Sequence, residues 1–207
     1  YPLSCDGTVM GALRLTSVNN YLACTSAAGI NADRDEVSFG PYWFSGVSMD
    51  RRVYVPLTGA SYARVIDTLT NTTSAAVAKD YLDQYADIGY PISPITIDSS
   101  SIQLVDRGDV PNALPYLKMV KHGVGRQIEY VGNKLTLIIP AGESVSIVSY
   151  LVSRTSCNTA SDLNSICVVA EADQVATNLF NGTQPGMFKG LTAADRANTR
   201  NFNIPTP

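Results

Sequence analysis

The segment from residue 133 to residue 153 constrains the fold more than any other part of the chain. It reads NKLTLIIPAGESVSIVSYLVS, two runs rich in strand-forming residues on either side of the turn sequence Pro-Ala-Gly-Glu at 140–143. This pattern predicts a hairpin in which Ile138 lies opposite Val145. Both faces of that ribbon carry apolar side chains, so neither faces bulk water along its whole length. We therefore expect the ribbon inside a β-sandwich, or between a sheet and a covering layer.

Strand-like alternation of apolar and polar residues recurs along most of the chain. It is clear at 9–15, at 52–55 and in several short segments between residues 95 and 131. No internal repeat and no low-complexity linker divides the sequence. The chain is therefore expected to form a single α+β domain, 1–207, built mostly from antiparallel, sandwich-like β-sheet.

Two stretches near the middle of the chain have helical spacing instead. Apolar side chains recur three and four residues apart in both, which predicts helices at 61–70 and 74–88. A further short helix is expected around 192–197. It is followed by an extended tail over about 198–207.

The four cysteines, Cys5, Cys24, Cys157 and Cys167, indicate two disulfides. Their spacing is not that of a zinc site, and the chain has only one histidine, so no metal is expected. Cys157 and Cys167 bracket a polar nine-residue loop. Closing this loop would contribute roughly 3 kcal/mol. Cys5 then pairs with Cys24, and buried free thiols in a cytosolic protein are the alternative.

Other features favour an extracellular protein. The chain begins at Tyr1 with neither a charged nor an apolar leader, so we expect that a signal peptide has been removed. Asn71 and Asn181 each begin an Asn-X-Thr sequon, which predicts N-glycosylation at both. Charged residues make up 16% of the chain, well below the roughly 25% of typical soluble domains. Such a composition is common in extracellular proteins and in assembly subunits.

Charge and hydropathy argue against several partners. The net charge is −3 and no cluster of basic residues alternates with aromatics, so nucleic-acid binding is disfavoured. No apolar run approaches 18 residues, so no membrane span is expected. The sequence has no glycine loop with the spacing that binds nucleotide phosphates, and no cofactor is expected.

Candidate catalytic residues are few. His122, the one histidine, could act as a general base, but a loop histidine beside Gly123 is the preferred interpretation. Glu129, inside a predicted strand, is the best candidate for a catalytic carboxylate, and an outward-facing strand residue is its alternative.

Two loop motifs give only weak indications of binding. The acidic segment ADRDE at 32–36 has the oxygen ligands that calcium prefers but lacks the EF-hand pattern, so a solvated loop is favoured. The tripeptide Arg107-Gly108-Asp109 matches the one that integrins read in many adhesion ligands. Its glycine is more simply a turn residue.

The consecutive aromatic residues Tyr42, Trp43 and Phe44 form a candidate binding surface. They cannot all face one side of a strand, so part of the cluster is expected to be exposed. Exposed aromatic rings are typical of sugar-binding surfaces and protein interfaces. A bent strand with all three rings under a loop is the alternative.

Three classes of function fit these features. The first is a structural subunit of an extracellular assembly, such as a filament, coat or surface layer, in which copies of the chain associate through β-rich contacts. The second is a secreted carbohydrate- or cell-surface-binding domain centred on Trp43. The third is a secreted hydrolase or toxin that uses Glu129 or His122. Enzymatic activity is the less favoured expectation, because no catalytic motif surrounds either residue.

Overall fold

The fold is seen in a computed structural model. It describes residues 12–13, 29–57, 62–84, 93–96, 102–106, 117–128, 134–153 and 166–205. These residues form mostly antiparallel β-sheet with two helices, so the predicted α+β class is confirmed.

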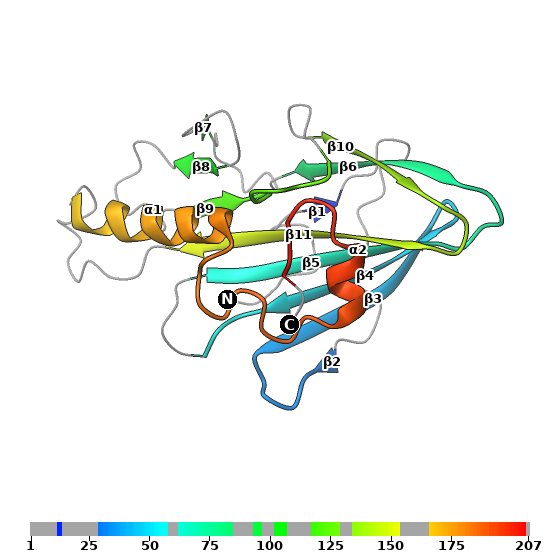
Figure 1. Cartoon of the computed structure of the whole chain (residues 1–207), viewed down its shortest axis with the longest axis horizontal. Helices are drawn as coiled ribbons and strands as arrows, with labels where there is room; N and C mark the ends of the chain where they lie inside the picture. The colour runs from blue at the N-terminus through cyan, green and yellow to red at the C-terminus, as the bar shows by residue number, and fades with distance from the viewer. Residues whose placement is uncertain are drawn as a thin grey trace.

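The strands form two sheets (Figure 1). The larger sheet has the order β2 (Gly29–Ile30), β3 (Glu36–Phe44), β4 (Val47–Tyr54), β5 (Tyr62–Asn71), β11 (Ser144–Ser153), β9 (Leu117–Val120), β8 (Ile102–Asp106) and β7 (Ser93–Thr96). The smaller sheet has the order β1 (Ala12–Leu13), β6 (Val77–Gln84) and β10 (Lys134–Ile139). Every pair of neighbouring strands is antiparallel.

The predicted hairpin at 133–153 is instead an arch that joins the two sheets. Ile138 of β10 pairs with Ala78 of β6, and Val145 of β11 pairs with Leu69 of β5. The chain also crosses between sheets from β5 to β6, so two arches lie together at one end of the molecule, the arch end (Figure 1). The turn was read correctly from the sequence, but both of its strands have other partners. An arch explains why the segment 133–153 is rich in apolar side chains, since each of its two strands turns one face to the space between the sheets.

The predicted helices at 61–70 and 74–88 are wrong. The first stretch is strand β5 and the described part of the second contains strand β6. β5 is a central strand with buried residues on both faces, so its apolar positions do not alternate and imitate helical spacing.

The helices lie nearer the C-terminus. They are α1 (Ile166–Asn181) and α2 (Ala193–Asn198), and α2 confirms the short helix predicted around 192–197. The tail that follows packs against the protein, because Phe202 and Ile204 are buried. Among the described residues, no helix is long and apolar enough to cross a membrane.

Two apolar cores lie on opposite faces of the larger sheet. The core between the sheets consists of Val47, Met49, Leu69, Tyr81, Leu135, Leu137, Ile139, Val145 and Ile147. The other lies under α1 and the C-terminal segment and includes Tyr54, Tyr62, Ile66, Val120, Val148, Tyr150, Val152, Ala176, Leu179, Met187, Leu191, Phe202 and Ile204. The helices therefore cover the second face mainly away from the arch end (Figure 1).

Candidate functional site

The helix-covered face of the larger sheet changes character along its strands. Successive residues of a strand point to opposite faces, so Ser48 and Asp50 share a face with Arg52 and Tyr54. Where α1 and the C-terminal segment pack, this face carries Tyr54, Ile66 and other apolar residues. Toward the arch end, the same face carries hydroxyl groups.

One row of side chains crosses four neighbouring strands at this end. Trp43 of β3 pairs with Ser48 of β4, Ser48 with Thr70 of β5, and Thr70 with Ser144 of β11. In the adjacent row, Asp50 pairs with Thr68. We call these six residues, Trp43, Ser48, Asp50, Thr68, Thr70 and Ser144, the hydroxyl face.

Hydrogen bonds between the strands order the hydroxyls of this face. The Thr70 and Ser144 oxygens are 2.8 Å apart, and those of Thr68 and Ser146 are 2.9 Å apart. One hydrogen bond uses only one of the two O–H donors in each pair. Thr68, Thr70 and Ser144 are partly exposed, so each pair retains a donor and acceptor capacity for a ligand.

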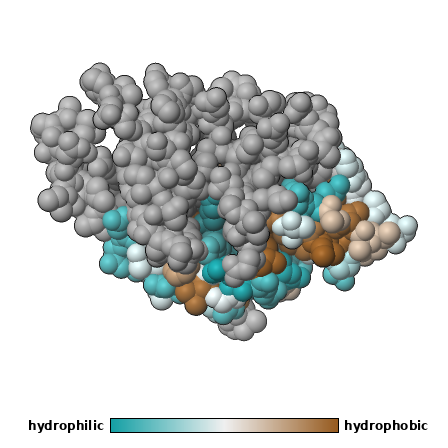
Figure 2. Space-filling model, turned by 90° about the horizontal axis from the view of Figure 1, so that it is seen from above, coloured by the Kyte–Doolittle hydropathy of each residue, from teal (hydrophilic) through white to brown (hydrophobic). Residues whose placement is uncertain are grey.

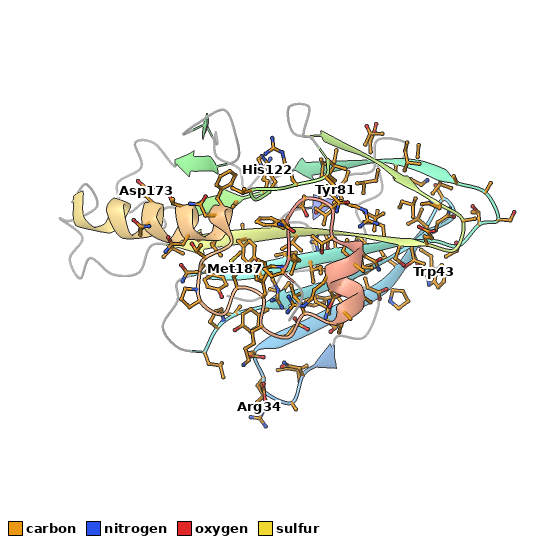
Figure 3. The ribbon with its side chains drawn as sticks, in the orientation of Figure 1. Arg34, Trp43, Tyr81, His122, Asp173 and Met187 are labelled. Carbon is orange, nitrogen blue, oxygen red and sulfur yellow. The ribbon has the colours of Figure 1, made fainter. Side chains whose placement is uncertain are left out.

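Trp43 forms the outer end of the row. Its side chain is 68% exposed, and Figure 3 shows it at the arch end, well away from His122. Tyr42 lies on the opposite side of β3 and is partly buried against the core between the sheets. The three aromatic residues of the predicted binding surface therefore do not act together. Trp43 is part of the exposed hydroxyl face, whereas Tyr42 faces the core between the sheets. The side chain of Phe44 lies outside what the structure describes.

A β-bulge beside Trp43 exposes Asp50. The register of β3 and β4 shifts between Phe39 and Tyr42, which places Gly40 near Asp50. A Cβ built on Gly40 would lie 3.1 Å from a carboxylate oxygen of Asp50 and 2.9 Å from the carbonyl oxygen of Met49. Only glycine therefore fits there without displacement, and its lack of a side chain leaves the carboxylate uncovered. Desolvation raises the pKa of Asp50, against a smaller lowering by Arg52.

Helix α2 borders the hydroxyl face. Thr192 caps this helix in a capping box with Asp195, and Asp195 also forms an ion pair with Arg52. Thr199, just after the helix, forms a parallel bridge with Ser146. Burial alone would raise the pKa of Asp195, but hydrogen bonds from Arg52 and Thr192 hold it below its usual value. The ion pair and the bridge fix α2 next to the face.

A buried cation, Arg64, anchors the segment before α2. Its side chain is fully buried and donates to the carbonyl oxygens of Met187 and Lys189 at 3.0 and 2.7 Å. It also forms a 2.9 Å ion pair with Glu36, and its guanidinium lies 4.7 Å from the centre of the Tyr54 ring. This network is structural, because no part of Arg64 reaches solvent.

The acidic loop at 32–36, for which a calcium site was the less favoured interpretation, binds protein cations. Asp35 pairs with Lys189 at 2.7 Å, and Glu36 pairs with Arg64 and with Arg52 at 3.4 Å. Within the described ranges, no group of three metal-ligating side chains is found. The interpretation as a solvated acidic loop was also incomplete, since all three of its carboxylates are engaged in ion pairs, Asp33 with Lys189 at 3.5 Å.

Of the two candidate catalytic residues, the structure describes only His122. His122 is buried, 6% exposed, and its ring meets that of Phe180 edge to face at 6.0 Å. Glu129 lies outside the described residues, as does the tripeptide at 107–109.

The two sequons differ in accessibility. Asn71 is 1% exposed, and its amide nitrogen donates to the carbonyl oxygens of Ala75, Ile139 and Pro140. A glycan on that nitrogen would have no room, so the predicted modification of Asn71 does not fit this fold. Asn181 ends α1 and is exposed, so glycosylation there stays a prediction.

The predicted disulfides are not tested by the structure. Cys5, Cys24 and Cys157 lie outside the described residues. Cys167 is in α1, but its side chain is also outside them.

Sequence reasoning found Trp43 but missed the rest of the hydroxyl face. Ser48, Thr70 and Ser144 are remote in sequence and adjacent only through strand register. One sequence pattern could have indicated these residues. Hydroxyl residues alternate with apolar ones at the ends of β4, β5 and β11 that meet at the arches.

Comparisons with known proteins give no family. No family model matches the chain, and no curated protein matches it. A solved structure that partly matches the chain is a polysaccharide lyase, with a TM-score of 0.37 and 14% sequence identity. The match covers 62% of this chain and 22% of the lyase, so the chain spans about a fifth of that protein. A likeness this distant carries no functional argument.

Proposed function

We propose that this chain is an extracellular carbohydrate-binding domain and that the hydroxyl face is its binding surface. The observation that carries the proposal is the row Trp43–Ser48–Thr70–Ser144, in which one exposed indole is in line with the partly exposed, hydrogen-bonded hydroxyls of Thr70 and Ser144, while Ser48 between them is 7% exposed. The four cysteines and the exposed sequon at Asn181 support the extracellular location.

The chemistry of a sugar matches both parts of this row. A pyranose ring has an apolar C–H face, which packs on an indole, and a rim of hydroxyls that donate and accept hydrogen bonds. Side-chain hydroxyls also donate and accept, so they can satisfy a sugar hydroxyl in either sense. Four strands spaced about 4.8 Å apart give a row of about 14 Å, room for about three sugar units.

The polarity of the face favours this ligand over others. A sheet face that packs permanently against protein is apolar, as the helix-covered part of this sheet is. A nucleic acid would need several cations, and none of the six residues of the hydroxyl face is basic.

The test uses the fluorescence of Trp43, the only tryptophan of the chain. Oligosaccharides that cover the indole should shift its emission to shorter wavelength with saturation. Trp43→Ala should weaken binding measured by calorimetry. Burying roughly 80 Å² of the ring is worth about 2 kcal/mol, or about thirtyfold in Kd.

Ile138→Ala is the matched control. Ile138 is 71% exposed at the same end of the molecule but lies on the smaller sheet, on β10. Figure 2 shows hydrophobic side chains at this end among polar ones. Equal loss of binding in both variants, or no loss in Trp43→Ala, would show that the hydroxyl face is not the binding surface.

A structural role in an assembly is the second candidate, favoured by a different surface. Ile30, Val55 and Leu57 are 62%, 50% and 69% exposed near the β2 edge of the larger sheet. Contact between copies of the chain there would cover them. Light scattering of the wild type and of Ile30→Lys tests this role: a higher mass that the lysine reduces would support it, and a monomer in both would refute it.

A further inference from the structure

The hydroxyl face has one charged member, Asp50. It lies on β4, two residues from Ser48, and its strand partner on β5 is Thr68. Its side chain is exposed, and Gly40, the bulge residue next to its carboxylate, has no side chain to cover it. The carboxylate therefore lies in the proposed site, in the row of side chains next to the one that begins at Trp43.

The cations near Asp50 are bound by other protein groups. Arg52, the nearest cation on the same strand face, forms ion pairs with Glu36 and Asp195. Lys79 donates to the carbonyl oxygen of Ser45 at 2.9 Å, on the turn beyond Trp43. The cations near the face are thus held by protein oxygens, and the Asp50 carboxylate is the charge that a ligand on the face would meet.

A carboxylate in this position has a definite chemical preference. It carries two oxygens that only accept hydrogen bonds, so it binds a pair of adjacent hydroxyls, which each donate one. A ligand that carries carboxylates or sulfates would instead bring a like charge next to it, which is unfavourable.

We infer that Asp50 is the specificity-determining residue of this face: it accepts hydrogen bonds from neighbouring hydroxyls of a neutral polysaccharide and rejects acidic ones. This inference rests on the proposed function and adds the class of sugar to it. The hydroxyls of Thr68, Thr70 and Ser144 bind other hydroxyls of the same chain, and the indole of Trp43 packs on one of its rings. The ligand then runs across the strands, along the row.

The experiment compares sugars that differ only in charge. Hexamers of β-1,4-linked mannose and glucose are titrated beside hexamers of the corresponding uronic acids, with Trp43 fluorescence and calorimetry as readouts. We expect wild-type protein to bind a neutral hexamer at least fivefold more tightly than its uronate. Raising the salt concentration should reduce that difference, because salt screens exposed like charges.

Asp50→Asn is the informative variant, because it should move the two affinities in opposite directions. An amide offers one acceptor oxygen and no charge, so neutral binding should weaken three- to tenfold while uronate binding should strengthen. Damage to the fold would weaken both. Asp33→Asn, which removes the same charge from an exposed loop residue at the opposite end of β3, should change neither.

The outcomes separate this inference from the proposed function. Wild-type protein that binds uronates as tightly as neutral hexamers overturns the role of Asp50 and leaves a carbohydrate-binding face. An Asp50→Asn variant whose two affinities move together overturns it as well. No binding of any hexamer, with unchanged Trp43 emission, overturns both.

Discussion

Replacing Asn71 with aspartate tests how the two arches are held together. Asn71 is the last residue of β5, and its amide nitrogen donates to Ala75 in one arch and to Ile139 and Pro140 in the other, at 2.7, 2.9 and 3.1 Å. Its amide oxygen accepts from the backbone N–H and the hydroxyl of Thr73. This arrangement fixes the orientation of the amide, since three carbonyl oxygens surround one end and two donors the other.

The magnitude follows from these contacts. Aspartate has the same shape but replaces the donating nitrogen with an oxygen, so two N–H donors that three carbonyl oxygens share are lost, at about 1 kcal/mol each. A buried carboxylate that faces carbonyl oxygens adds a further penalty. We expect the free energy of unfolding of Asn71→Asp to be about 3 to 5 kcal/mol below that of the wild type at pH 7.

The loss should depend on pH with a known sign. Burial among carbonyl oxygens raises the pKa of the new carboxyl above its unfolded value of about 3.9. The charge penalty is therefore absent below about pH 4 and grows as the pH rises toward the folded pKa. At low pH the protonated carboxyl also regains one donor, so the gap between the variant and the wild type should narrow.

Urea denaturation followed by circular dichroism measures this effect. The expected shift in midpoint is about 1 to 2 M at pH 7. Thr73→Ala is the matched control, since it destroys the same sequon but keeps the amide of Asn71, and it should cost no more than about 1 kcal/mol. A shift of under 0.5 M in Asn71→Asp, or the same loss in both variants, would show that Asn71 does not join the arches.

Two further predictions concern the charged networks. Arg64→Met removes a buried cation but leaves the carbonyl oxygens it binds, so unfolding in urea should show a loss of about 2 to 4 kcal/mol. Lys189→Met should make stability less sensitive to acid. A hydrogen bond from Lys189 lowers the pKa of Asp35 below the usual value of an aspartate, so the pair stabilises the fold fully above the unfolded pKa and loses its effect as the pH falls through the folded pKa. Denaturation midpoints at pH 6 and pH 3 should therefore differ less in the variant, and equal differences would contradict this role of the pair.

The fold class was predictable because it depends on short-range pattern. Alternation indicated strands, the turn at 140–143 was read correctly, and the capping pattern of Thr192 and Asp195 lies in the predicted short helix. The partners of the strands were not predictable, because an arch and a hairpin place the same turn between the same strands. The helix prediction at 61–70 failed for a related reason, since a strand buried on both faces loses the period of two.

The site was predictable only at Trp43, where a single exposed ring stands out in the sequence. The remaining members become a surface only when β3, β4, β5 and β11 are aligned, and nothing local sets that alignment. A serine or threonine near a turn is ordinarily a turn residue. Here the hydroxyls are in strands, so their role depends on tertiary structure.

The arch clasp and the hydroxyl face are physically coupled, because they occupy neighbouring positions of the same strands. Asn71 follows Thr70 on β5, and its backbone N–H donates to Glu143, which precedes Ser144 of β11, at 2.9 Å. This bond fixes the register that places Thr70 opposite Ser144. A slip of β11 by one residue against β5 would put Val145 on the face in place of Ser144 and turn the Ser144 hydroxyl toward the core. Asn71 therefore joins the arches through its side-chain amide, and its backbone N–H holds the register that keeps Ser144 on the solvent side, in line with Trp43.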